Sequence, residues 1–314
     1  MLTRRHIRIK VMQSFYSYSI GKKKKLEDEI VFFRESVTQT YHLYFLILAL
    51  LKSIKTYVDD QLLAYRKNQI QKDGKYLKFE HLSKNRFLEF IKQHDHLQKQ
   101  LENKKFIRWD LEFVFMKDLV EKIISQKTFD NYLQKEKPSE LEDLHWLIKC
   151  FKNTIATSPY LYEYLEDHNL TWIDDLPVIN TFVLKTLKKL NLKNSKTLKF
   201  PKLEDSYEDL KFGTDLLKKS ILKEKELLNE LKGKTPNWDA GRIASLDLVI
   251  LKIAITEILF FPNIPSKVSI NEYLEIAKDY STPNSNNFIN GVLDKLVREF
   301  IDDKRMIKVG RGLL

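Results

Sequence analysis

The chain has 314 residues, 43% of them hydrophobic, with only eight glycines and eight prolines. Few breakers beside many leucines, lysines, isoleucines and glutamates indicate long helices and short loops. Its single cysteine, Cys150, excludes an intrachain disulfide and is expected to be a buried thiol. Lysine and arginine exceed aspartate and glutamate by 11, being 54 against 43. This excess indicates a polyanionic partner, although a general preference for lysine would also produce it.

The first predicted element is an amphipathic helix over residues 3–20, because apolar residues recur at helical spacing from Ile7 to Tyr18. Thr3 is a suitable N-cap for this helix. The basic residues of the segment lie mostly off the apolar stripe; they are Arg4, Arg5, Arg8 and Lys10. A charged, amphipathic start is not a secretory leader, so we expect a cytoplasmic protein.

The middle of the chain, after Gly21 and a lysine run, is predicted to be a series of helices. Residues 45–51 are strongly apolar but too few to span a bilayer, so we expect a core helix and no membrane contact. No alternation typical of strands has useful length, so we predict an all-α protein. The expected segments are one kinked helix or two over 26–72, a loop over 68–80, helices over 83–103 and 109–135, and a break at Pro138.

Two stretches about 66 residues apart resemble each other. Glu142–Trp146 aligns with Glu208–Phe212, and after a shift of one residue Trp172 falls near Trp238. Each copy would contain a long helix, a loop with a tryptophan, and an apolar helix, as in a duplicated unit. Because any two amphipathic helix pairs can match in this way, duplication is a hypothesis.

The last third of the chain starts with a helix over residues 244–261 that is apolar on nearly all sides and is therefore expected to be buried. Asp247, in its first turns, is favoured by the helix dipole. Pro262 and Pro265 end this helix and stiffen the loop. The stretch Ser269–Glu272 has the form of a capping box, with Ser269 as the N-cap of the next helix.

A final helix is predicted to start at Asn284–Ser285. Gly291 within it costs about 1 kcal/mol relative to alanine, and such a glycine indicates a close approach of helices. Phe288 is consistent both with stacking on a base and with a core position. Amide side chains and free backbone N–H groups at this start suit phosphates and base edges; the amides belong to Asn284, Asn286, Asn287 and Asn290.

In these features the chain resembles the NusB family of bacterial transcription antitermination factors. The resemblance rests on Arg4–Arg8 with Gln13 and Phe15–Tyr16, on Ile264–Glu272 with Ala277–Lys278, and on Phe288–Lys295. It covers residues 1–20 and 205–302. Residues 21–204 remain as a helical insertion, and 303–314 as a basic tail. The long form is similar to versions in Bacteroidetes-type bacteria.

The resemblance implies a helical NusB-like bundle without enzymatic activity, metal or cofactor. It implies binding of boxA-type single-stranded RNA together with NusE, a small-subunit ribosomal protein, in a complex on RNA polymerase that promotes ribosomal RNA transcription. The positions that match the family's RNA-binding residues are Arg4, Arg5, Arg8, Lys267, Asn284, Ser285, Asn287 and Phe288, while Asp247 and Ser266 match those towards NusE. His6 stands where the family has a basic residue.

Several alternatives stay open. An RNA cytosine methyltransferase with a NusB-like domain would need a glycine-rich cofactor loop and a catalytic cysteine, and the sequence offers neither. A helical scaffold for proteins, without specific RNA binding, is the second alternative, and a homodimer that hides the basic opening is also compatible. The insertion would add a helical layer, replace a partner, or extend the RNA path through its lysine-rich stretch 185–202, for which a solvated linker is the simpler interpretation.

Overall fold

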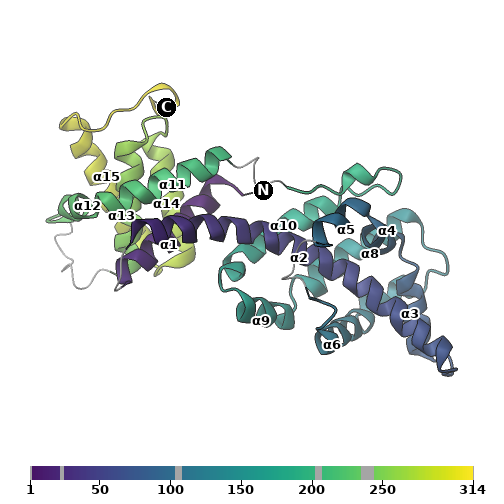
Figure 1. Ribbon diagram of the computed structural model, residues 1–314. Coiled ribbons are helices and arrows are strands. Elements are labelled where there is room, and N and C mark those ends of the chain that lie inside the picture. Colours follow the sequence, from purple (N-terminus) through teal and green to yellow (C-terminus); the bar gives the residue numbers. More distant parts are fainter. Residues whose placement is uncertain (1, 22–24, 103–107, 202–206, 235–243, 314) are drawn as a thin grey trace. The chain divides into compact units, whose positions relative to one another are not determined.

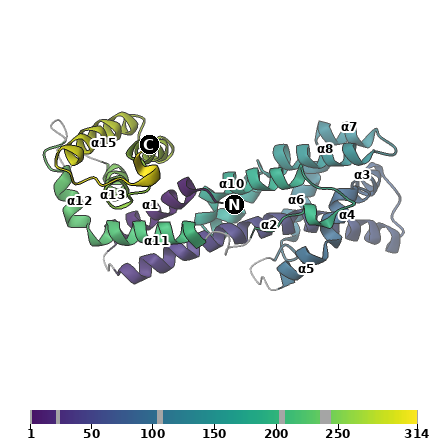
Figure 2. The ribbon, with the colours of Figure 1, turned by 90° about the horizontal axis from the view of Figure 1, so that it is seen from above.

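The computed structural model describes residues 2–21, 25–102, 108–201, 207–234 and 244–313. Within these ranges the secondary structure consists of helices and one isolated bridge between Asn191 and Asn194, which confirms the predicted all-α class (Figure 1, Figure 2). The chain forms two compact units. Unit 1 contains Met1–Thr38 and Leu203–Leu314, and unit 2 contains Gln39–Lys202. Unit 2 thus begins 18 residues after the expected start of the insertion at residue 21.

Unit 1 is built around one apolar helix, α13. This helix contacts all of α1, α11, α12, α14 and α15, and its side chains from Val249 to Ile258 are buried, as the sequence predicted for residues 244–261 (Figure 1). The bounds of the helices are α1 Arg4–Ile20, α11 Tyr207–Leu222, α12 Glu224–Leu231, α13 Ser245–Phe260, α14 Ser266–Tyr280 and α15 Ser285–Asp302, followed by a short 3₁₀ turn, η4, Gly310–Leu313.

Helices of unit 1 pack closely at Gly213 of α11, which lies against α1 and the first turns of α2, Leu26–Lys67. A Cβ atom on Gly213 would lie 2.3 Å from Cζ of Phe33 and 2.6 Å from Cγ2 of Ile7, both buried residues. Gly291 of α15, by contrast, has no such neighbour within 4 Å. The predicted close approach at Gly291 is therefore wrong, because that glycine faces outward.

Unit 2 contains the rest of α2 and the helices that follow it. Residues 26–67 form one helix, and its stretch Leu43–Leu51 is fully or almost fully buried, as expected for a core helix. The further bounds are α3 Gly74–Ser83, α4 Arg86–Gln93, α5 Asp95–Glu102, α6 Phe113–Ile124, α7 Lys127–Leu133, α8 Glu140–Cys150, a π-helical turn η1 Phe151–Ile155, α9 Pro159–His168, α10 Thr171–Leu187 and a 3₁₀ turn η2 Ser195–Thr197.

Local caps divide several segments that hydrophobic periodicity joins. The expected loop over 68–80 contains most of α3, whose N-cap Asp73 accepts a hydrogen bond from the backbone N–H of Tyr76 at 2.7 Å. The expected helix over 83–103 is two helices, and Asn85 caps the first by accepting from the backbone N–H groups of Phe87 and Leu88. The helix expected over 109–135 is likewise divided into α6 and α7.

The two halves of the suggested repeat have the same order of helices. Residues 140–187 form α8 with η1, then α9, then α10, and residues 207–260 form α11, α12 and α13. Trp172 lies inside α10 rather than in a loop, and it donates a hydrogen bond from Nε1 to the backbone oxygen of Gln39. Its counterpart Trp238 lies outside the described residues. Duplication remains a hypothesis.

The expected basic tail folds back onto the loop between α13 and α14. The backbone N–H of Val309 donates to the carbonyl of Pro262 at 3.1 Å, and Lys308 donates from Nζ to the carbonyl of Phe261 at 3.2 Å. Gly312 touches Pro262 so closely that a Cβ atom would lie 1.9 Å from its carbonyl oxygen. The tail therefore supports the proline loop that lines the site described next.

Candidate nucleic-acid interface

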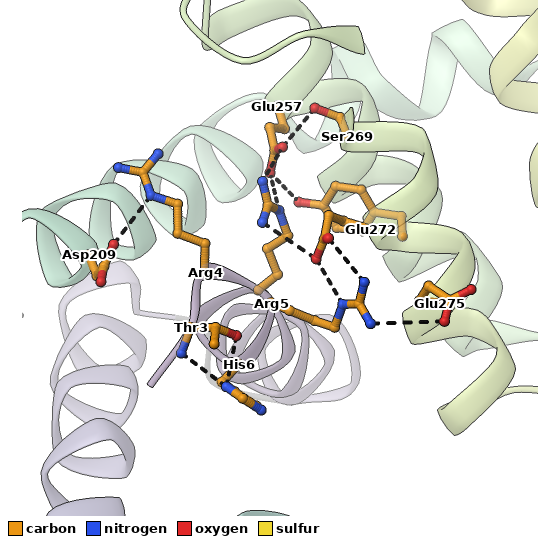
Figure 3. A network of polar contacts seen from close by, with 11 residues as sticks. Thr3, Arg4, Arg5, His6, Asp209, Glu257, Ser269, Glu272 and Glu275 are labelled. Atoms are coloured by element: carbon orange, nitrogen blue, oxygen red, sulfur yellow. Dashed lines mark hydrogen bonds and ion pairs between the residues drawn. The ribbon is translucent and has the colours of Figure 1, made fainter. Parts of the chain in front are cut away.

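The candidate interface forms where the start of α1 meets α14 (Figure 3). Residues 263–265 of the proline loop lie at the same place. Thr3 is the N-cap of α1, as predicted, and its backbone N–H donates to Nδ1 of His6 at 3.0 Å. Nδ1 can accept this hydrogen bond only when it carries no proton. The histidine that replaces a basic family position therefore helps to cap the helix and holds its ring beside the arginines.

Arg8 is part of a buried ionic network. Its side chain is 4% exposed and donates two hydrogen bonds to Glu257, from Nε at 2.8 Å and from Nη2 at 2.7 Å. Glu257 also accepts from the hydroxyls of Ser269, at 2.7 Å, and Tyr273, at 2.9 Å. Burial would lower the pKa of Arg8, but the hydrogen bonds and charge of Glu257 outweigh it and raise that pKa above its ordinary value.

This burial corrects two expectations about the basic residues of α1. Arg8 and Lys10 lie inside the unit rather than off the apolar stripe. The Nε–Nη2 edge of Arg8 is bonded to both oxygens of Glu257, its Nη1 lies 3.8 Å from Glu272, and burial keeps the rest of the guanidinium from a phosphate. Arg8 therefore joins α1 to α13 and α14 and is not available as an RNA contact in this structure.

Arg5 pairs with Glu272, the residue that was predicted to form a capping box with Ser269. It donates from Nε and Nη2 to the two oxygens of Glu272, at 2.9 and 3.0 Å, and lies 3.9 Å from Glu275. The capping box is wrong, because α14 begins at Ser266 and Ser269 is a buried residue of its second turn. The hydrogen bond from Arg5 is the main cause that lowers the pKa of Glu272 below its ordinary value of 4.5.

Arg4 is the most exposed of the three arginines, with 48% of its side chain accessible against 40% for Arg5. Its Nε lies 3.2 Å from a carboxylate oxygen of Asp209, and its guanidinium lies over the ring of Phe212 at 5.0 Å. A guanidinium placed over an aromatic ring and 48% exposed can also contact a second planar group from solvent.

An open hollow of about 750 Å³ lies beside these arginines. It is lined by Thr3, Arg4, Arg5, His6, Arg8, Asn263, Ile264, Pro265, Val268 and Glu272. A second hollow of about 440 Å³ adjoins it and shares Arg4, Asn263 and Ile264 with the first. The hollow thus combines arginine guanidinium groups with apolar side chains. This combination matches the chemistry of single-stranded nucleic acid, which presents phosphates and flat bases together.

The other predicted RNA positions fall at two places. Lys267 is exposed in the first turn of α14, next to Val268 of the hollow. At the start of α15, Asn284 and Asn287 are exposed and Phe288 is half-buried, and none of them lines the hollow.

Asp247, which was predicted to contact NusE, is buried. Asp247 is 1% exposed, and its carboxylate accepts hydrogen bonds from the hydroxyls of Ser281 and Ser285, the latter at 2.8 Å. Ser285, predicted to bind RNA, is thus buried and bonded to Asp247. Together they join the first turn of α13 to the first turn of α15. Ser266, the second position towards NusE, is half-exposed at the start of α14.

The ion pairs that Asp209, Glu257 and Glu272 form with the arginines of α1 were not predicted from the sequence. Glu257 had a usable signal, because an ionisable residue inside an otherwise apolar helix requires a buried partner. The other two carry no such signal, since the contacts link residues 205 and 267 positions apart in the chain.

The fold and the site define an all-α protein whose basic first helix is tied by ion pairs to a C-terminal helical bundle. The C-terminal part of the chain matches the NusB family, over residues 178–298. The match begins within α10 and ends in α15, so α1 lies outside it. The structure nevertheless places α1 in the same unit as the matched helices α11, α13 and α14.

Three curated relatives bear the name transcription antitermination protein NusB. That of Salinibacter ruber is 40% identical over 103 residues, which are 33% of this chain and 64% of the relative. That of Chloroherpeton thalassium is 46% identical over 25% of this chain and 37% of the relative. That of Geobacter sulfurreducens is 40% identical over 29% and 66%. The matches span less than two thirds of each relative, and no solved structure matches significantly.

No described helix is long and apolar enough to cross a membrane. Within the described ranges, no cluster of three or more histidine, cysteine, aspartate or glutamate residues is suited to hold a metal ion.

Proposed function

We propose that the protein is a cytoplasmic transcription antitermination factor that binds boxA-type single-stranded RNA together with NusE and joins a complex on RNA polymerase. The observation that carries the proposal is the hollow at Arg4 and Arg5, which adjoins α14 and the proline loop of the family match. The names of the three curated relatives support the same role.

The ion pairs at the hollow suit exchange of a carboxylate for a phosphate. Arg4 and Arg5 are both at least 40% exposed, and such pairs contribute about 0–1 kcal/mol each. A phosphate therefore displaces Asp209 or Glu272 at small cost. Until then, Glu272 holds the Arg5 fork in a fixed orientation at the hollow.

We assign RNA contacts only to side chains that are exposed or half-buried. We assign RNA contacts to Arg4, Arg5 and Lys267, with Asn284, Asn287 and Phe288 as a second group at the start of α15. Arg8 and Ser285 receive structural roles. We assign Ser266 as a direct contact with NusE. We assign Asp247 an indirect role, because its hydrogen bond with Ser285 fixes the start of α15.

The test is fluorescence anisotropy of a labelled boxA-like RNA, with and without purified NusE, over a series of salt concentrations. We expect binding that tightens with NusE and weakens for a scrambled RNA. Arg5→Gln combined with Lys267→Gln removes two cations and is expected to flatten the log–log salt slope by about 1.4. Lys225→Gln combined with Lys295→Gln, at two exposed positions that do not line the hollow, is the control. Equal binding of both RNAs in all variants contradicts the proposal.

A second candidate function is a scaffold that binds proteins and not RNA. The observation in its favour is that all three arginines of α1 are paired with carboxylates inside unit 1. Capture of NusE without any binding of RNA would favour this function. Sedimentation of the free protein at several concentrations reports on the homodimer that would cover the hollow.

A further inference from the structure

Unit 2 carries a segregated positive charge that the hollow of unit 1 does not explain. Residues 39–175 contain 21 lysines and arginines and 21 aspartates and glutamates, so this part of the unit is formally neutral. Residues 176–202 contain seven lysines and no acidic residue. A general preference for lysine would spread the excess over the unit. The whole net charge of unit 2 instead falls in one segment of 27 residues.

This segment is an ordered turn rather than the solvated linker considered from sequence. We call residues 185–199 the lysine turn. Its backbone is closed by hydrogen bonds: the N–H of Asn191 donates to Oγ1 of Thr197 at 3.0 Å, and the N–H of Lys196 to Oδ1 of Asn194 at 3.0 Å. Leu190 and Leu198 are buried on either side of it. Because Asn191 and Thr197 are bonded, the lysines between them are held close together.

The cationic side chains of the turn point to solvent. Within the described part of unit 2, all six are exposed and none forms an ion pair; they are Lys185, Lys188, Lys189, Lys193, Lys196 and Lys199. Lysines in the last turn of α10 also favour its dipole, but that effect is confined to the final turn of a helix. It accounts for Lys185 and leaves Lys193, Lys196 and Lys199 without a structural purpose.

Aromatic rings flank the end of the turn. The ring of Phe200 stacks on Phe45 at 5.9 Å, and the ring of His96 lies 4.7 Å from Phe200. His96 is exposed, and Phe200 is half-buried. Tyr44 fixes this end of the turn by donating from its hydroxyl to the carbonyl of Lys199 at 2.8 Å. The exposed ring of His96, backed by the half-buried Phe200, thus lies beside the end of the lysine turn.

We propose that the lysine turn, together with the ring pair of His96 and Phe200, is a second binding surface for single-stranded RNA. Lysines track the phosphates without reading sequence, and the rings offer a platform for a base. An acidic protein segment would pair with the lysines, and its carboxylates would not contact the rings. A lipid surface is disfavoured, because no large hydrophobic side chain is exposed in residues 176–201. The proposal rests on RNA as the ligand of this protein.

The test uses the full-length protein and a labelled single-stranded RNA of about 20 nucleotides over a salt series. The turn variant is Lys188→Gln, Lys189→Gln, Lys193→Gln and Lys196→Gln. Each phosphate contact on a single strand contributes about 0.7 to the log–log salt slope, so we expect this slope to fall by about 2–3 and affinity to fall at least tenfold at 0.1 M salt. The matched control changes four other exposed, unpaired lysines of unit 2 to glutamine, Lys117, Lys127, Lys149 and Lys152, and is expected to bind as the wild type does.

The rings are tested separately, since stacking is not ionic. His96→Ala removes an exposed ring without disturbing the core, and we expect binding to weaken about fivefold with an unchanged salt slope. An equal loss in the turn variant and the control variant would overturn the proposal. So would a turn variant that binds RNA like the wild type, or one that loses only binding to phosphatidylglycerol vesicles or polyglutamate.

The failure of this proposal is distinguishable from failure of the proposed function. Loss of RNA binding in the Arg5→Gln and Lys267→Gln variant, with an unaffected turn variant, contradicts the second surface alone. Absence of RNA binding by the wild type contradicts both. Melting curves of all variants verify that the exposed substitutions leave the fold intact.

Discussion

At the scale of single residues, one basic motif contains side chains with different tasks. Arg4 and Arg5 lie at an open hollow, whereas Arg8, one helical turn on, is buried against Glu257. A buried pair pays for its desolvation only while both partners remain, so removal of one partner leaves an uncompensated charge. Stability and RNA binding should therefore separate within this motif.

Arg8→Ala is expected to lower the free energy of unfolding by about 3–5 kcal/mol, because Glu257 is left buried without a cation. Arg4→Ala, at an exposed pair, should change it by at most about 1 kcal/mol. Urea unfolding followed by circular dichroism measures both. A double variant, Arg8→Met with Glu257→Leu, should recover much of the loss. Equal effects of Arg8→Ala and Arg4→Ala would contradict the buried network.

The pair of Arg5 and Glu272 predicts a pH dependence. The pKa of Glu272 is lowered in the folded protein, chiefly by the hydrogen bond from Arg5, so the folded state binds its proton less readily than the unfolded state. Its contribution is full above the ordinary pKa of 4.5 and is lost as the pH falls through the lower folded value. Glu272→Gln should therefore destabilise slightly at pH 7, by at most about 1 kcal/mol.

Urea midpoints of wild type and Glu272→Gln, measured from pH 7 down to about pH 3, test this sign. The difference between the two proteins should shrink towards acid. A difference that grows as the pH falls would show that the carboxylate of Glu272 is not stabilised by Arg5.

At the scale of elements, two glycines in helices have opposite meanings. Gly213 lets α11 approach α1 and α2, and a methyl group there would overlap the buried side chains of Phe33 and Ile7. Gly291 faces open space in α15. The same substitution thus probes packing at one site and helix propensity at the other.

Gly213→Ala is expected to destabilise the protein, because overpacking costs about 1–3 kcal/mol against a helix gain of about 1. Gly291→Ala should stabilise it by about 0.5–1 kcal/mol, since alanine loses less backbone entropy in a helix. Thermal melts of the two variants should shift in opposite directions. Stabilisation by both would mean that the helices separate at Gly213 at little cost.

At the scale of the whole molecule, the chain has two units, each with its own core. Each unit also has its own buried or half-buried ionic tie: Arg8 with Glu257 in unit 1, and Arg86 with Asp143, at 2.6 Å, in unit 2. Units with separate cores need not unfold in one transition.

Hydrogen exchange tests this independence. Arg8→Ala should speed exchange of the backbone amides of α13 and leave those of α8 unchanged, and Arg86→Ala should do the reverse. The expectation follows because each substitution removes contacts within one unit only. Faster exchange of both helices in either variant would show that the continuous helix α2 couples the units.

Much of the helical content followed from sequence, because apolar spacing, scarce breakers and caps act within a few residues. This is why α1, the burial of α13 and the core stretch of α2 were predictable. The division of residues 83–103 into α4 and α5 was missed, since Asn85 caps α4 within a run whose periodicity continues through it. The prediction of a close helix approach at Gly291 was wrong for a related reason, because the spacing of residues does not show whether a neighbouring helix is present.

The sequence by itself determined an all-α protein with a basic opening and a NusB-like C-terminal part, because these depend on residue type and local order. Only the tertiary structure decided which basic residues are available. Glu257 and Glu272 reach α1 from helices about 250 residues further along the chain, and that contact buries Arg8 while leaving Arg5 at the hollow. The role of a charged residue depends on its burial and its partner, and both are fixed by packing between segments that sequence order keeps far apart.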